Sequence, residues 1–206
     1  VNHVQINPKA GLDFAGGLRA ILRQDPDVIM VGEIRDGETA DIAIRAALTG
    51  HMVFSTIHTN DAPGALTRLM DMGVEPFLIA SSVNAVIAQR LARSLCPRCK
   101  EPYDLPMEAP ERLGLGLPDS PVTLFRARGC SWCSNTGYRG RLALFELLLI
   151  TPEIRELVAK KAPAGEIHRI AVEQGMLPLV KDGAEKAMKG LTTLDEVLRV
   201  AYSDER

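Results

Sequence analysis

Several features that would narrow the class of this chain at once are absent from its 206 residues. No apolar run approaches the roughly 18 residues of a membrane-spanning helix. Aromatic residues make up only 4% of the chain, which leaves few platforms for stacking single-stranded nucleic acid. The formal net charge is −2, so bulk charge favours neither nucleic acid nor an anionic membrane. The sequence also lacks GxxxxGKS and GxxxxGKT, the glycine-rich loops that cradle phosphate groups.

Two strand-like apolar runs each end at a polar residue of a kind that catalysis uses. Val28–Val31 is followed by Gly32 and Glu33, and Met52–Ile57 is followed by His58. The segment between them, 38–48, has apolar residues at helical spacing. Strands that alternate with helices are typical of an α/β protein with a parallel sheet. Ligands bind at the carboxyl ends of such strands, so we expect Glu33 and His58 to face one cleft.

Glu33 is the first candidate catalytic residue. A carboxylate at a strand end can hold Mg²⁺ through water or orient a water molecule for phosphoryl transfer. The alternative is an ordinary strand that ends in a solvated glutamate. Arg35, two residues further on, has two interpretations: a phosphate or metal contact, or part of a surface turn.

His58 is the second candidate, with Thr56 and Thr59 beside it. A histidine here can bind a terminal phosphate or transfer protons, whereas the alternative is a structural histidine. Arg19 and Arg23 are four residues apart on one face of a predicted helix. Arginine suits phosphate contacts across a subunit boundary, but both side chains could equally be solvated.

The four cysteines form two CxxC pairs, Cys96 with Cys99 and Cys130 with Cys133. Four thiolates in tetrahedral array fit Zn²⁺, and this spacing lets backbone amides support the sulfurs. A four-sulfur site has no open position, which predicts a structural role. A redox pair and unrelated thiols are the alternatives. Paired cysteines in a chain of this size fit a metal in a reducing cytoplasm better than disulfides.

Composition divides the chain into three predicted parts. Residues 1–95 alternate strand and helix patterns, residues 96–141 are rich in proline and glycine, and residues 142–206 open with a strand and continue as helices. In the first part the pattern predicts helices over Pro63–Met70 and Ser81–Leu95. In the last it predicts a strand followed by four helices, over these ranges: Leu142–Ile150; Pro152–Lys160, Ala164–Gln174, Leu179–Lys189 and Thr193–Tyr202.

Five motifs in this order carry a family resemblance: LRQDPDVIMVGEIRD, LTGHMVFSTIHTND, VIAQRLARSLCPRCKEPY, GCSWCSNTGYRGR and GLTTLDEVLRV. The chain resembles the ATPases of type II secretion and type IV pilus assembly, of the GspE and PilB type, apart from the stretch 105–126. Retraction ATPases of the pilus resemble the first part but generally lack the four cysteines. The resemblance therefore favours a secretion or assembly ATPase, without deciding between the two systems.

The resemblance implies a RecA-like ATPase core that uses ATP and Mg²⁺ in the intact protein. It implies a hexameric ring on the cytoplasmic face of the inner membrane that acts on a secretion or pilus platform. Glu33 matches the acidic residue of the family's Walker B motif, and Thr56 to Thr59, with His58, match its His box. The four cysteines match its zinc site, which makes the fold a partial RecA-like core with a zinc subdomain and a C-terminal helical part.

The family's Walker A loop and Asp box are expected upstream of Val1. We therefore expect this chain alone to be inactive toward ATP, and to be a monomer or weak oligomer. Two alternatives remain: a non-catalytic, zinc-stapled interaction module, and a zinc-ribbon nucleic-acid binder. The second has some support from basic residues near the second CxxC pair, although low aromatic content and net charge oppose it; these residues are Arg126, Arg128, Arg139 and Arg141.

Overall fold

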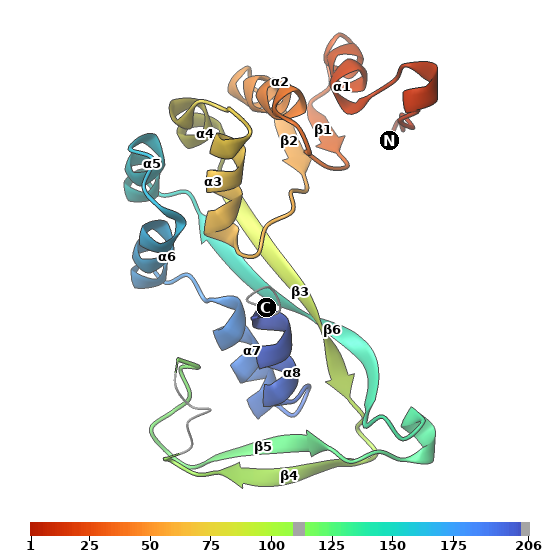
Figure 1. Cartoon of the computed structure of the whole chain (residues 1–206), viewed down its shortest axis with the longest axis vertical. Coiled ribbons are helices and arrows are strands. Elements are labelled where there is room, and N and C mark those ends of the chain that lie inside the picture. The colour runs from red at the N-terminus through yellow and green to blue at the C-terminus, as the bar shows by residue number, and fades with distance from the viewer. Residues whose placement is uncertain (109–113, 203–206) are drawn as a thin grey trace. The chain divides into compact units, whose positions relative to one another are not determined.

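The computed structural model describes residues 1–108 and 114–202 (Figure 1). The chain divides into two compact units, each made of two segments. Unit 1 comprises Val1–Val86 and Leu148–Gln174, and unit 2 comprises Ile87–Leu147 and Gly175–Arg206. The division into parts 1–95, 96–141 and 142–206 stays a prediction. Residues 109–113 of its middle part and 203–206 of its last lie outside the described residues.

Unit 1 alternates helices with short strands, which confirms the α/β class. Its elements are η1 (Pro8–Ala10), α1 (Phe14–Leu22), β1 (Val28–Val31), α2 (Gly37–Leu48), β2 (Met52–Ser55), α3 (Ala62–Asp71), α4 (Pro76–Ser82), α5 (Pro152–Ala159) and α6 (Ala164–Glu173). Three of the longer helices begin at an aspartate whose carboxylate accepts a backbone N–H of the first turn: Asp13 for α1, Asp36 for α2 and Asp61 for α3. These caps fix where each loop becomes a helix.

The sheet of unit 1 is the parallel pair β1–β2, with Val28 opposite Met52 and Val31 opposite Ser55. Its two faces differ. Ile29 and Val31 are buried on one face. The other face carries four apolar side chains that are 50–75% exposed: Val28, Met30, Met52 and Phe54. Parallel strands with a continuous apolar run are usually buried on both faces. Within the described residues only one face is covered.

Unit 2 contains most of β3 and β6. Its elements are β3 (Ala85–Leu95), β4 (Lys100–Leu105), β5 (Val122–Ala127), η3 (Ser131–Cys133), β6 (Tyr138–Leu149), α7 (Leu179–Met188) and α8 (Leu194–Ala201). Strand β3 pairs with β6, and β4 pairs antiparallel with β5. Apolar side chains of β4, β5 and the two helices form the core of this unit: Leu105, Leu115, Val122, Leu124, Ala184, Ala187 and Leu194.

The predicted helix Ser81–Leu95 is wrong. Helix α4 ends at Ser82, and Ala85–Leu95 is the strand β3. Burial along β3 follows a two-residue period, with Ala88 and Ala92 buried. A spacing of four residues fits both a helix and a strand, and Arg90 and Ser94 on the inner side hide the alternation. The predicted strand Leu142–Ile150 corresponds to β6, and the four predicted C-terminal helices correspond to α5, α6, α7 and α8.

Helices α7 and α8 cover the two outer edges of the β3–β6 pair within unit 2. On β6, Asp182 accepts the Phe145 N–H at 2.9 Å, and Lys186 donates to the Ala143 carbonyl at 2.9 Å. On β3, Glu196 accepts the Arg93 N–H at 3.0 Å. Unpaired strand edges invite further pairing, so these side chains close the edges of the ribbon.

Candidate functional site

Glu33 and His58 follow the neighbouring carboxyl ends of β1 and β2. Pairing continues beyond the two strands, because the Ile34 N–H donates to the Thr56 carbonyl at 2.9 Å. The Thr56 hydroxyl also donates to the Gly32 carbonyl at 2.7 Å. These two bonds tie the segment that carries Glu33 to the segment that carries His58. Thr56, a predicted cofactor-binding residue, therefore has a backbone contact here.

The carboxylate of Glu33 is 13% exposed and has two basic neighbours. The Arg35 Nε donates to Oε2, and the His58 Nε2 lies 2.5 Å from Oε1. The second contact has the distance of an ion pair but not the geometry of a hydrogen bond. Oε1 is buried and has no hydrogen-bond donor within residues 1–108 and 114–202. A buried carboxylate oxygen without a donor is costly, so this atom is suited to a ligand.

The two basic side chains are far more exposed than the carboxylate. His58 is 89% exposed and Arg35 70% exposed. The His58 ring, the more exposed of the two, can therefore turn in solvent. The structure brings Glu33, Arg35 and His58 into contact, and their catalytic and binding roles stay predictions.

Thr59 lies one residue beyond His58, where the loop enters α3. Its hydroxyl donates to the Asp61 carbonyl at 3.0 Å. Asp61 in turn accepts the Gly64 N–H at 2.8 Å and caps α3. Thr59 therefore supports the turn that follows His58, and its predicted contact with a cofactor stays a prediction.

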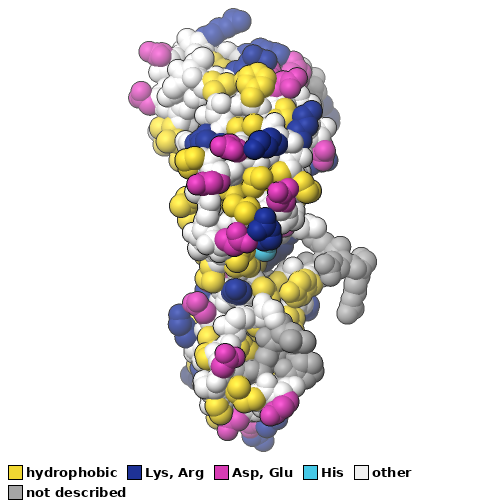
Figure 2. Space-filling model, turned by 90° about the vertical axis from the view of Figure 1, so that its left-hand side faces the viewer, with side chains coloured by type: hydrophobic (Ala, Val, Ile, Leu, Met, Phe, Trp, Pro, Cys, Tyr) yellow, Lys and Arg dark blue, Asp and Glu magenta, His cyan; other side chains and the backbone are white. Residues whose placement is uncertain are grey.

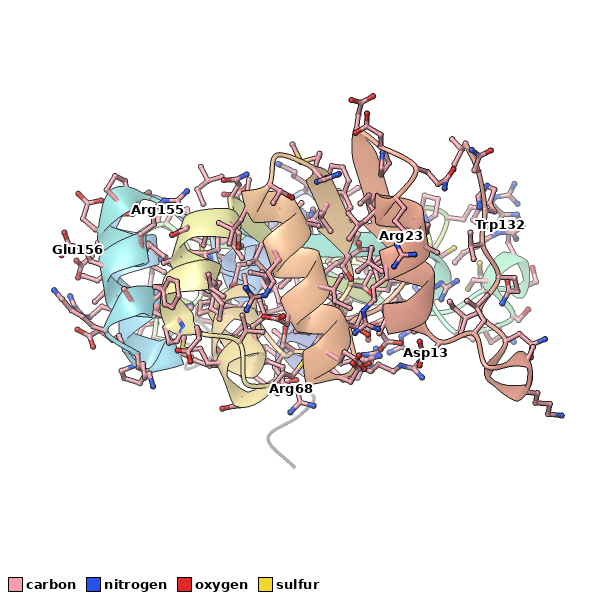
Figure 3. The ribbon with its side chains drawn as sticks, turned by 90° about the horizontal axis from the view of Figure 1, so that it is seen from above. Asp13, Arg23, Arg68, Trp132, Arg155 and Glu156 are labelled. Atoms are coloured by element: carbon pink, nitrogen blue, oxygen red, sulfur yellow. The ribbon has the colours of Figure 1, made fainter. Side chains whose placement is uncertain are left out.

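Arg19 and Arg23 differ in their surroundings. Arg19 forms an ion pair with Glu38 of α2, and both side chains are more than half exposed. The sequence shows no obvious acidic partner for Arg19 one turn further along its own helix. The partner in the structure, Glu38, is 19 residues away. Arg23 lies at the C-cap of α1 (Figure 3). Of the two, Arg23 is the arginine without an ion pair among the described residues, and the role of each stays a prediction.

The four cysteines converge in unit 2. Their sulfurs all lie within 4.8 Å of one another. Three pairs are shorter: Cys96–Cys130 at 3.9 Å, Cys99–Cys133 at 3.8 Å and Cys130–Cys133 at 3.7 Å. A tetrahedral Zn²⁺ with bonds of about 2.3 Å separates its sulfurs by about 3.8 Å, whereas a disulfide needs about 2.05 Å. The four thiols are thus free and arranged for a metal ion.

Backbone amides support the sulfur of Cys133. The N–H groups of Cys130 and Gly137 donate to it at 3.2 and 3.3 Å. Burial alone would raise the pKa of Cys133, but these two bonds, together with contacts from the Cys130 and Cys99 thiols, lower the pKa to about 6. Gly137 has a φ of +76°, and a Cβ there would lie 2.5 Å from the Cβ of Ala127. Glycine is therefore required where the chain approaches the sulfur.

A cation–π stack joins the two CxxC pairs and was not predicted from the sequence. Arg98, inside the first pair, lies 4.4 Å from the ring centre of Trp132, which is inside the second pair. Arg139 lies 4.1 Å from the same ring and donates to the Trp132 carbonyl at 2.8 Å. The sequence feature that could have predicted this stack is that Arg98 and Trp132 occupy the same position within their CxxC pairs. The stack adds a contact between the two pairs beyond the four sulfurs.

Similarity to solved structures defines the fold class. The chain resembles the pilus retraction motor PilT with bound ADP, with a TM-score of 0.62 and 27% identity over 91% of this chain and 43% of that one. It also resembles the ATPase DotB of Legionella pneumophila, with a TM-score of 0.63 and 24% identity over 93% of this chain and 42% of that one. The second likeness shows fold alone. These neighbours place the chain in the RecA-like α/β class, to which the four-cysteine cluster adds a possible metal site.

The family follows from the match of one family model. The model described as "Type II/IV secretion system protein" covers residues 1–199, so the chain belongs to that family. The type II secretion system protein E of Pseudomonas aeruginosa is 53% identical over 99% of the chain and 40% of that protein. The type IV pilus assembly ATPase PilB of Myxococcus xanthus is 48% identical over 96% of the chain and 35% of that protein. The chain thus spans well under half the length of these relatives.

Proposed function

We propose that this chain carries the catalytic residues of an ATP-hydrolysing motor that drives secretion or pilus assembly. One observation carries the proposal: the buried Oε1 of Glu33, without a hydrogen-bond donor, facing His58 across two adjacent strand ends. Family membership supports it, as do relatives named as type II secretion and pilus assembly ATPases and a similar motor solved with ADP. A structural glutamate would have both oxygens hydrogen-bonded or solvated.

Glu33 acts on the attacking water in this proposal. Its carboxylate orients the water and accepts a proton as the water oxygen bonds to the terminal phosphorus and ADP leaves. His58 contacts the terminal phosphate, and its 89% exposed ring can turn from Glu33 toward that group. Glu33 would also hold Mg²⁺ through water. The metal, when bound, offsets the negative charge of the phosphates.

The exposed face of the β1–β2 pair supports a larger core in the intact protein. Four apolar side chains on that face are at least half exposed, a pattern that a covering layer would explain. The phosphate-cradling loop is absent from these 206 residues, and relatives are more than twice as long. We therefore place nucleotide binding in the intact protein, with Arg19 and Arg23 directed to the phosphates of a neighbouring subunit.

The zinc cluster is structural in this proposal. Four Cys ligands leave Zn²⁺ no open position for a substrate. Neighbouring subunits of a hexamer and an inner-membrane platform are the proposed partners, with the motor on the cytoplasmic side. No helix among the described residues is long and apolar enough to cross a bilayer. Membrane association through the platform is part of the proposal.

Three contacts in unit 2 oppose the nucleic-acid alternative. Arg128 and Arg126 pair with Glu101, and Arg139 packs on Trp132, so three of the four basic residues that suggested it have local partners. On the face in Figure 2, Lys and Arg side chains are interspersed with Asp and Glu. A non-catalytic, zinc-stapled module remains the second candidate function.

ATP turnover by the full-length protein that contains this chain tests the proposal. We expect Glu33→Gln to lower kcat by about two orders of magnitude or more, the scale of a lost phosphoryl-transfer group. His58→Ala should lower turnover while the protein remains folded. Steep salt-dependent DNA binding would support the nucleic-acid alternative. A folded, ring-forming protein whose turnover ignores Glu33→Gln would make the zinc-stapled module the leading function.

A further inference from the structure

Glu33 and Arg35 lie on the same side of the segment that leaves β1. The residue between them, Ile34, is 8% exposed, and its N–H pairs with the Thr56 carbonyl. Extended residues alternate sides, so the anchored Ile34 sends both neighbours to the opposite side. This placement lets the Arg35 Nε reach Oε2 of Glu33.

The backbone of this segment is fixed at both ends. Before it, the Thr56 hydroxyl bonds the Gly32 carbonyl. After it, the Asp36 carboxylate accepts the Thr39 N–H at 2.8 Å and its hydroxyl at 3.0 Å, and Thr39 is 1% exposed. The backbone that carries Arg35 is thus anchored on both sides, although the Arg35 side chain itself is 70% exposed. Among the described residues its ion pair is with Glu33.

Arg35 makes the two oxygens of Glu33 inequivalent. Oε2 accepts from the Arg35 Nε, whereas Oε1 is buried without a hydrogen-bond donor. A carboxylate that could rotate freely would present either oxygen. With one oxygen held by a guanidinium, the other keeps a single direction, toward His58.

We propose that Arg35 is a positioning residue for Glu33, in addition to any contact that it makes with a nucleotide. Arg35 holds Oε2 so that Oε1 is the atom offered to the attacking water, and its charge offsets that of Glu33. Offsetting matters because an unpaired carboxylate repels an incoming polyphosphate. The inference rests on the proposed function, since it assigns the geometry of the same carboxylate.

The sequence left two other readings of Arg35: a direct phosphate contact and a surface turn. The three interpretations predict different kinetics. A positioning residue acts on the chemical step, so its loss lowers kcat while the Kd for nucleotide changes little. A phosphate contact made in the ground state weakens nucleotide binding. A surface turn changes neither.

The experiment compares Arg35→Ala and Arg35→Lys in the full-length protein that contains this chain. ATP turnover gives kcat, and titration with a fluorescent ATP analogue gives Kd. Arg45→Ala is the matched control, because Arg45 is a similarly exposed arginine paired with Asp41 on α2. We expect Arg35→Ala to lower kcat by roughly 10- to 100-fold, the scale of a misplaced catalytic group, and to change Kd by less than about 3-fold. Arg35→Lys should recover part of kcat, because it keeps the charge but lacks the fixed Nε donor.

Each other outcome overturns the inference. A Kd at least 10-fold weaker with kcat nearly unchanged would make Arg35 a phosphate contact only. Kinetics equal to those of Arg45→Ala would make it a surface residue. A lower kcat that Arg35→Lys restores fully would reduce its role to charge alone. Failure of the proposed function looks different, because Glu33→Gln itself would then keep its turnover. Circular dichroism of both Arg35 variants verifies that the comparison is between folded proteins.

Discussion

Glu196 of α8 bonds both the main chain and the side chain of Arg93 on β3. Its Oε1 accepts the Arg93 N–H at 3.0 Å, and its Oε2 accepts from the guanidinium at 2.8 Å. Arg199, one turn further along α8, donates to both oxygens at 2.6 and 2.9 Å. The Glu196 side chain is fully buried. A buried carboxylate with these donors ties α8 to the edge of the strand that leads to Cys96.

The pKa of Glu196 predicts how acid affects unit 2. Burial alone would raise this pKa, but hydrogen bonds from Arg199 and Arg93 lower the pKa from 4.5 to about 2. A lowered folded-state pKa stabilises the fold above the unfolded value, and this stability is lost as pH falls from about 4.5 to 2. The shift corresponds to about 3 kcal/mol at neutral pH. We expect the free energy of unfolding of unit 2 to fall over this window.

Substitution of Glu196 tests the same contact at neutral pH. Glu196→Gln should lower the free energy of unfolding by about 2–4 kcal/mol, because two arginines lose a buried partner. Its unfolding should also depend less on pH between 4.5 and 2. Chemical denaturation, followed by circular dichroism at several pH values, measures both. Glu185→Gln, at an exposed position of α7, is the control. Equal behaviour of the two variants would show that the Glu196 network contributes little.

Removal of zinc should separate the two CxxC pairs, and the single tryptophan reports it. Trp132 is the only tryptophan of the chain and packs against Arg98 of the opposite pair. We expect about one zinc per chain by atomic emission, as four thiolates in tetrahedral array imply. A strong chelator should shift Trp132 fluorescence to longer wavelength, because the ring loses its neighbour and gains solvent.

Cys99→Ser is the matching substitution. Loss of one ligand should weaken zinc affinity at least 100-fold, more than the loss of an outer contact. Ser131→Ala changes an exposed side chain in the same turn as Trp132 and should keep full zinc content. A chain purified from zinc-containing medium that holds no zinc, with four reactive thiols, would instead support the unrelated-thiol alternative.

The sequence predicted elements with strong periodicity or capping. Helix α2 begins within one residue of its predicted start, because Asp36 caps it and its apolar residues repeat at helical spacing. Strand β3 was mistaken for a helix because Ala88 and Ala92 fit either period. Pairing with β6, about fifty residues further along the chain, decides that this segment is a strand and not a helix. No local pattern contains that information.

The contacts at the candidate site also divide into those that sequence patterns predicted and those that depend on the folded structure. Strand order alone predicted that Glu33 and His58 would be neighbours, and CxxC spacing predicted the cysteine cluster. Prediction of the Glu33–Arg35 pair required knowing that Ile34 is buried and that its N–H is bound by the Thr56 carbonyl. The partner of Arg19, Glu38, lies on another helix and could not be found by counting residues along one face.

Gly37 permits a close contact between two elements next to Glu33. It is the first residue of α2, and a Cβ there would lie 2.2 Å from the Met72 carbonyl oxygen. Backbone cannot move aside cheaply, so we expect Gly37→Ala to lower the free energy of unfolding by about 1–3 kcal/mol. Gly165→Ala, in the first turn of α6, is the control. Nothing lies within 4 Å of its Cβ, and the change should stabilise by up to about 1 kcal/mol. Thermal melting compares the stabilities of the two variants. Equal melting temperatures would contradict a destabilising contact between the added Cβ and the Met72 carbonyl oxygen.

The chain alone should not hydrolyse ATP. Glu33, His58 and Arg35 can act only on a phosphate held in front of them, and no GxxxxGKS or GxxxxGKT loop exists in these 206 residues to hold it. We expect no turnover above background, no saturable MgATP binding at micromolar concentration by calorimetry, and a monomer or weak oligomer by light scattering. The full-length protein is the positive control under the same conditions. Micromolar MgATP binding by the chain alone, abolished by Glu33→Gln together with His58→Ala, would show that these strand ends bind nucleotide without a phosphate cradle.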